Sequence, residues 1–258
     1  MSTVKSDVKA ATLARAEDWT LEYREKANRA NSNLELLTYG VYRIAPGGAG
    51  INFAHPGQEA LLFCVAGAAE IALDGQTYPM AHYDVLYVPS GMPYDLRQTG
   101  DAAAELVLCR APAATVHPVW HARWSEVSKD ETRIRHLDGK DVFLMFDVSE
   151  AADKLIAGYT IYEPHTRAWP PHNHTDQEEI YMFPQGHGAM EVYADEENKT
   201  FVTSVEPGDA VTIPLLNYHP VFSQAEELHF IWCIAGERYW VGDKNKDFMT
   251  GKGDPLTT

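Results

Sequence analysis

The sequence is poor in positive charge and in long apolar runs, and each shortage argues against a class of protein. Its 258 residues include 21 Lys and Arg against 37 Asp and Glu, which gives a formal net charge of −16. Such acidity disfavours binding to nucleic acid or to an anionic membrane. No apolar run approaches the roughly 20 residues that a membrane-spanning helix needs. Residues 1–7 lack the apolar core of a signal peptide.

Cysteine is also scarce, and its positions indicate reduced thiols. Cys64, Cys109 and Cys233 each lie within an apolar, strand-like run. An odd number of cysteines in such settings predicts buried, unpaired thiols and a cytoplasmic protein. The remaining composition, with 45% apolar and 22% charged residues, is that of an ordinary globular protein.

The chain changes character after its first thirty residues. Residues 8–30 contain no Pro or Gly and are rich in Ala, Glu, Arg and Lys, which predicts a helix from about Asp7 to Arg29 within an N-terminal segment 1–32. Beyond it, short apolar runs alternate with turns, including a hairpin turn at Asp74-Gly75. Many short strands with frequent turns predict an all-β sandwich or barrel.

This strand-rich part reads as two copies of one unit. The run 85–94 aligns with 210–219, so that Tyr94 stands where the second copy has His219. Upstream, His55 and Glu59 are taken as the remnant of the first copy's ligand motif. We therefore predict a structural N-terminal barrel over 33–118 and a metal-bearing C-terminal barrel over 119–258.

The second copy carries a set of metal-binding residue types. On a strand, alternate side chains share one face, so His172 and His174 would point the same way about 7 Å apart. A turn and a second strand could bring Glu179 beside them, and His219 offers a third imidazole. An isolated His-x-His is common on surfaces. Three imidazoles and one carboxylate, however, suit Zn, Mn, Fe or Ni with open positions for a substrate.

The spacing resembles the two-part pattern of the cupin superfamily. The chain reads His-x-His-x4-Glu-x6-Gly over 172–186 and Gly-x5-Pro-x4-His over 208–219. This resemblance implies a bicupin, two tandem double-stranded β-helix (jelly-roll) barrels following the N-terminal helix. It also implies one divalent metal ion per chain, first Zn or Mn and otherwise Fe or Ni, held by His172, His174, Glu179 and His219.

Further motifs resemble the bicupin uronate isomerases. Residues 170–174 and 218–221 are similar to the 5-deoxy-glucuronate isomerase of inositol breakdown, and 230–237 to the 5-keto-4-deoxyuronate isomerase of pectin breakdown. The resemblance implies a metal-dependent aldose–ketose isomerase that acts on a small uronic-acid-like sugar. We expect 5-deoxy-glucuronate as the substrate, with 5-keto-4-deoxyuronate as the alternative. A homo-oligomer is also expected, because open sheet edges favour pairing.

An isomerase of this kind needs a base and proton donors near the metal, and the chain offers three candidates. The base should be a carboxylate or neutral imidazole in a partly dry interior. Glu191 and His187 meet that description by residue type. Tyr181 shares the strand parity of Glu179 and is a candidate hydrogen-bond donor to the substrate, although core packing explains it equally well.

Recognition of a sugar carboxylate requires a cation, and the sequence leaves open which residue provides it. The inositol-pathway pattern places Gln-Arg before a Val-Tyr pair, whereas this chain has Met190 and Glu191 there. Arg238, Lys244 and Arg133 are the candidates to replace the missing arginine.

Two other functions use the same fold and ligands. A cupin dioxygenase would use the three-His-one-Glu set with a redox metal and would depend on oxygen. A non-catalytic, sugar-binding bicupin would bind without turnover.

Overall fold

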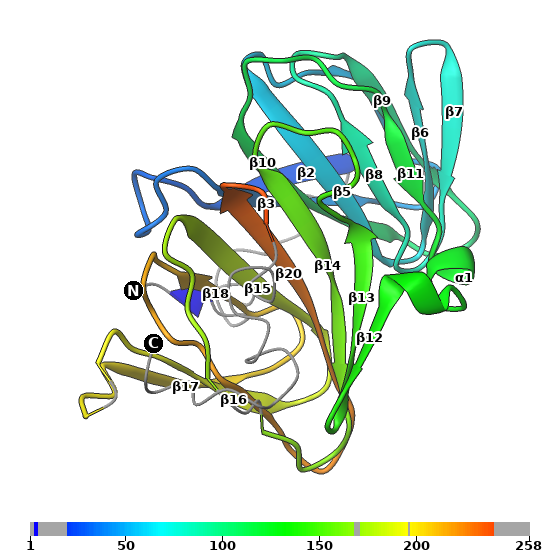
Figure 1. The fold of residues 1–258 in the computed structure, drawn as a ribbon. Coiled ribbons are helices and arrows are strands. Elements are labelled where there is room, and N and C mark those ends of the chain that lie inside the picture. Colours follow the sequence, from blue (N-terminus) through cyan, green and yellow to red (C-terminus); the bar gives the residue numbers. More distant parts are fainter. Residues whose placement is uncertain (1–2, 5–19, 168–170, 196, 240–258) are drawn as a thin grey trace.

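The structure, a computed structural model, describes residues 3–4, 20–167, 171–195 and 197–239, and almost all of its regular structure is β (Figure 1). The first half forms two antiparallel sheets. The larger has the order β11 (Trp120–Ala122), β8 (Val85–Val88), β5 (Gln58–Ala66), β10 (Ala104–Pro112), β3 (Thr38–Ile44), β2 (Leu21–Ala27). The smaller has the order β4 (Ala49–Phe53), β9 (Tyr94–Thr99), β6 (Ala68–Leu73), β7 (Gln76–Met80).

The second half repeats this arrangement. Its larger sheet has the order β1 (Thr3–Val4), β18 (Ala210–Ile213), β15 (Gln177–Gln185), β20 (Leu228–Gly236), β14 (Leu155–Tyr162), β13 (Lys140–Phe146), β12 (Ile134–Leu137). Its smaller sheet has the order β17 (Phe201–Val205), β16 (Gly188–Val192), β19 (Val221–Ser223). The helix α1 (Trp124–Val127) and the 3-10 turn η2 (Glu131–Arg133) connect the halves. The prediction of two tandem β-barrels is confirmed.

Three apolar cores hold this architecture together. Along β5, Ala60, Leu62 and Cys64 point into the first barrel, whereas Leu61 and Phe63 point out of it. The outward-pointing residues of both large sheets form one shared core, and there β14 packs on β5 and β13 on β8. Figure 1 accordingly shows the first half, blue to green, lying against the second, green to orange. Because the strands of the large sheets are buried on both faces, they read as continuous apolar runs.

Equivalent backbone hydrogen bonds show which residues of the two copies correspond. Cys64 N–H donates to Asp84 O and Tyr83 N–H donates to Cys64 O. In the second half, Phe183 N–H donates to Asp209 O and Gly208 N–H donates to Phe183 O. Cys64 therefore corresponds to Phe183, which aligns Glu59 with Glu178 rather than with Glu179. The prediction that Glu59 is a remnant of the ligand motif is wrong.

The predicted N-terminal helix is also wrong where the structure describes it. Residues 21–27 form β2, which pairs antiparallel with β3, while 5–19 lie outside the described residues. Leu21 and Tyr23 pack against the core of the first barrel, and Arg24 and Lys26 face the other way. This period-2 alternation is a strand signal. Burial of one face outweighed the intrinsic helix propensity of Glu, Arg and Lys.

The predicted hairpin turn and the predicted free cysteines are confirmed. Asp74 and Gly75 both have positive φ, 51° and 70°, and form the two-residue turn between β6 and β7. Cys64, Cys109 and Cys233 are buried and free. In the described part of the chain, no helix has the length and apolar character needed to cross a membrane.

Candidate metal centre

Four side chains of the second barrel converge on one point. One potential ligand atom each from His172, His174, Glu179 and His219 lies within 4.8 Å of the others. The His172 ring centroid is 5.1 Å from that of His174 and 4.4 Å from that of His219. Glu179 lies on β15, whereas the three histidines lie outside the strands. Glu179 and His174 are almost fully buried, as is His219.

The local backbone explains how the loop histidines are held. His172 and His174 belong to the irregular segment 171–176, not to a strand as the His-x-His spacing predicted. Leu216 N–H donates to His174 O at 2.7 Å, which ties this segment to the loop that carries His219. His219 Nδ1 lies 2.9 Å from Asn217 O, so it donates its hydrogen to that carbonyl.

The hydrogen-bonding pattern of His219 fits a bound cation. Because Nδ1 carries the hydrogen, Nε2 of a neutral imidazole presents a lone pair. That atom faces Glu179 Oε2 at 3.1 Å and is buried without a hydrogen-bond partner. A lone pair and a carboxylate oxygen repel at this distance unless a cation or proton lies between them. Three nitrogens and one oxygen suit a borderline divalent metal, and the carbonyl at Nδ1 orients the ring as metal-bound histidines require.

The electrostatics of the cluster favour unprotonated ligands. Burial lowers the pKa of His172 well below its ordinary value, and positive charge on His219, His174 and Lys140 lowers it further. Burial by itself would raise the pKa of Glu179, but the adjacent imidazoles of His174 and His219 outweigh burial, so the pKa is lowered. A neutral imidazole beside a charged carboxylate is the state in which both bind a metal ion.

Tyr181 is the one predicted catalytic residue that lies at the cluster. Its ring is 5.5 Å from that of His219 and 4.6 Å from that of Phe230, and the side chain is buried. Burial raises its pKa well above 10, with a further contribution from the negative charge of Glu179. Tyr181 therefore keeps its hydroxyl proton and can donate a hydrogen bond, but it is not a base near neutral pH.

The structure separates the two predicted bases from the cluster. Met190 and Val192 on β16 point into the barrel core, so Glu191 points out of it. Its Oε2 lies 3.9 Å from both Arg167 and Lys199. His187 is exposed in the turn after β15, where Nδ1 lies 2.5 Å from Glu226. Neither residue is placed to serve as the base.

The predicted substrate cations are likewise occupied elsewhere. Arg238 donates to the carbonyl oxygens of Asp147, Glu150 and Leu155, at 2.6, 2.7 and 3.0 Å. Arg133 donates to the Glu150 carboxylate and to Leu144 O. Both arginines therefore stabilise backbone segments through hydrogen bonds. Lys244 lies outside the described residues.

Sequence reasoning missed Lys140, the first residue of β13. It lies opposite Tyr162 of β14, with its Nζ 3.5 Å from the Tyr162 hydroxyl. Its charge acts on His172, so it lies at the cluster's end of the barrel. The residue follows the Asp138-Gly139 turn and precedes an apolar run, and such a basic residue at a strand end gives no signal of its own.

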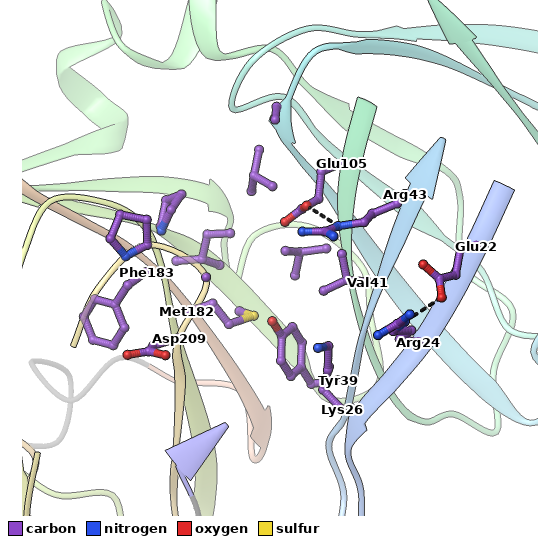
Figure 2. A pocket seen from close by; sticks show the side chains of 17 residues that line it. Glu22, Arg24, Lys26, Tyr39, Val41, Arg43, Glu105, Met182, Phe183 and Asp209 are labelled. Atoms are coloured by element: carbon purple, nitrogen blue, oxygen red, sulfur yellow. Dashed lines mark hydrogen bonds and ion pairs between the residues drawn. The ribbon is translucent and has the colours of Figure 1, made fainter. Parts of the chain in front are cut away.

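A separate cavity lies between the two halves (Figure 2). It is lined by β2, β3 and β10 on one side and by Met182, Phe183 and Asp209 on the other. Its cations have internal partners, since Arg43 pairs with Glu105 at 2.9 Å and Arg24 with Glu22 at 2.6 Å. None of the four cluster residues lines it.

Comparisons with known sequences identify relatives over most of the chain. The sequence model described as KduI/IolB family matches residues 11–250. A 4-deoxy-L-threo-5-hexosulose-uronate ketol-isomerase of Bacillus pumilus is 23% identical over 201 residues, covering 72% of this chain and 69% of that protein. The protein of the same name from Escherichia coli O139:H28 is 27% identical over 206 residues, covering 73% and 70%.

Solved structures show the same fold. An IolB-like protein from Salmonella typhimurium superimposes with a TM-score of 0.71 at 21% identity, covering 84% of this chain and 90% of that one. Oxalate decarboxylase of Bacillus subtilis superimposes with a TM-score of 0.69 at 15% identity, covering 86% and 75%. At these identities the likeness concerns the bicupin architecture alone.

Proposed function

This chain belongs to the KduI/IolB family, and on that premise we propose that it is a metal-dependent ketol-isomerase of a uronate. The convergence of His172, His174, Glu179 and His219 within 4.8 Å carries the proposal. A ketol-isomerase moves a proton between adjacent carbons, so that an aldehyde at C1 and a hydroxyl at C2 become a hydroxyl and a ketone. The match to this chain covers two thirds or more of the length of the relatives named for this reaction.

The proposed substrate differs from the one that the sequence motifs favoured. The curated relatives are named for 4-deoxy-L-threo-5-hexosulose uronate, a hexuronate with a ketone at C5 and no hydroxyl at C4. That is the 5-keto-4-deoxyuronate of the alternative expectation. We therefore place it ahead of 5-deoxy-glucuronate as the substrate.

The residues of the site have distinct parts in this proposal. A divalent ion held by the three histidines and Glu179 would act as a Lewis acid toward the oxygens on C1 and C2. Tyr181, which keeps its proton, donates a hydrogen bond to a substrate oxygen. The apolar rings of Tyr181 and Phe230 exclude water from that side of the cluster. His219 is held in one tautomer by Asn217 O.

Metal analysis combined with two parallel assays tests this proposal. About one Zn or Mn per chain is expected in the wild type. The double variant His172→Ala/His174→Ala should lose both the metal and turnover. His55→Ala is the matched control, because His55 has the place of His174 in the first barrel. It should retain both properties.

The substrates are compared with the same purified protein. Turnover of 4-deoxy-L-threo-5-hexosulose uronate that exceeds turnover of 5-deoxy-glucuronate supports the proposal, and the reverse order restores the earlier expectation. Bound metal with oxygen uptake and no isomerisation would replace the isomerase by a dioxygenase. A wild-type protein without metal would contradict the metal centre itself.

A further inference from the structure

Lys140 lies opposite Tyr162 on the inner side of the second barrel, and it has no anionic partner among the described residues. Burial is the only influence that shifts its pKa, which it lowers to about 8. Arg133 is neutralised by Glu150, and Arg238 is surrounded by carbonyl oxygens. The neighbouring carboxylate, Asp141, bonds to His136 instead. Lys140 is therefore a partly buried cation without a carboxylate partner inside the described chain.

Lys140 is connected to the metal centre by a row of aromatic side chains. Its Nζ lies 5.3 Å from the Tyr162 ring centroid. The Tyr162 ring contacts Phe230 at 5.4 Å, Phe230 contacts Tyr181 at 4.6 Å, and Tyr181 contacts His219 at 5.5 Å. The ammonium group and the cluster thus border one continuous aromatic surface on the inside of the barrel.

Uncompensated charge at a desolvated position costs stability, and a bound anion removes that cost. We propose that Lys140 binds the carboxylate of the sugar acid while the reacting carbons lie at the metal centre. This inference rests on the proposed function and names the residue that selects an acid over a neutral sugar. It also supplies the cation that the strongly acidic chain needs, in place of Arg133 and Arg238. The Tyr162 hydroxyl, 3.5 Å from Nζ, orients the ammonium group.

The test compares Lys140→Met, Lys140→Arg and the control Lys129→Met, whose side chain is exposed beside α1. Each variant is assayed with the uronate and with its C6 primary amide, which has the same shape without the charge. Loss of a charged hydrogen bond should raise KM for the uronate about 10- to 100-fold in Lys140→Met. KM for the amide should stay within about 3-fold. Lys140→Arg should retain most of the preference for the acid, and Lys129→Met all of it.

Two further measurements exclude a structural explanation. Metal content should be unchanged in Lys140→Met, and its Tm should not fall, because removing a partly buried charge that has no ion-pair partner does not destabilise the barrel. A Tm that falls in Lys140→Met but not in Lys140→Arg would show that the charge is needed for folding and would overturn the inference.

The failure of this inference is distinguishable from the failure of the proposed function. If the wild type does not turn over the uronate, the proposed function fails. If the wild type does so and Lys140→Met keeps the wild-type preference for acid over amide, the assignment of Lys140 is wrong while the isomerase remains.

Discussion

The two barrels have the same backbone fold, but they place chemically different side chains at the equivalent inner position. Where the second barrel has His172, His174, Glu179 and His219, the aligned positions of the first hold Phe53, His55, Ala60 and Tyr94. The register agrees at both sites, since Ala60 pairs with Val88 on β8 and Glu179 pairs with Ile213 on β18. Only one of the four ligand types is retained in the first barrel.

An arginine takes part of the space that the ligands have vacated. Arg110 pairs with Ala60 across β5 and β10, whereas Ile234 pairs with Glu179 in the second barrel. The Arg110 guanidinium lies 3.3 Å from His55 Nδ1 and donates to Gln58 and Glu25 at 2.8 and 2.5 Å.

Tyrosine hydroxyls complete the first site. The Tyr94 hydroxyl lies 2.9 Å from His55 Nε2 and 3.0 Å from the Tyr42 hydroxyl. In the first barrel, the Arg110 guanidinium and the Tyr94 hydroxyl thus contact both ring nitrogens of His55. In the second barrel, His219 Nε2 faces Glu179 without a hydrogen bond. The inner position is therefore polar in both barrels. Among the described residues, the second barrel alone gathers there a group that could hold a metal ion.

The largest expected effect comes from removing the carboxylate at the metal centre. Glu179→Gln keeps the shape but removes the negative charge that faces His174 and His219. We expect metal affinity to fall at least 100-fold, with turnover falling in parallel. Isothermal titration calorimetry with Zn measures the affinity. Retention of wild-type affinity would show that Glu179 is not a ligand.

A second effect should be equal in the two barrels. Glu59 accepts hydrogen bonds from the backbone N–H groups of 153–155 in the second half. Glu178 accepts hydrogen bonds from the backbone N–H groups of 35–37 in the first half. Each buried carboxylate therefore links its own barrel to the other. Glu59→Gln or Glu178→Gln should lower the free energy of unfolding by about 3 kcal/mol. Urea denaturation measures it, and a large loss in only one variant would break the equivalence.

Rebuilding the missing ligands sharpens the comparison. We expect that Phe53→His, Ala60→Glu and Tyr94→His, combined with Arg110→Ile, give the first barrel a metal site. Metal content should rise from about one to about two ions per chain. The same substitutions without Arg110→Ile should bind less metal, because the guanidinium repels a second cation. Equal metal content with and without Arg110→Ile would mean that Arg110 does not exclude metal.

The smallest effect concerns pH. Burial, with the positive charge of Arg110, lowers the pKa of His55 from 6.5 to about 4. Between these values the unfolded chain binds a proton that the folded site does not, so the free energy of unfolding falls as the pH drops from 6.5 to about 4. His55→Gln should have a shallower slope over this range. An unchanged slope in parallel urea titrations would show that His55 does not contribute.

The β architecture, the duplication and the ligand residues of the candidate centre could all be predicted from the amino-acid sequence. Apolar runs of strand length and turn pairs such as Asp74-Gly75 are local signals, and they lie where the structure has β6, β7 and the large sheets. The ligand motif could be recognised because its spacing is fixed by a strand and two tight loops.

Which neighbouring charges belong to the site depends on contacts that form only in the folded chain. The side chain of Glu191 leaves the barrel because its strand parity is set by Met190 and Val192, which outweigh it in burial. Arg133 binds the Glu150 carboxylate and a backbone carbonyl, and Arg238 binds backbone carbonyls. Sequence spacing does not reveal these partners. Residues 21–27 became a strand because β3 offered an open edge and the first core had room for Leu21 and Tyr23. The side chain of Lys140 lies on the inner side of the second barrel because β13 and β14 pair in one register, and such pairing is a property of the whole sheet.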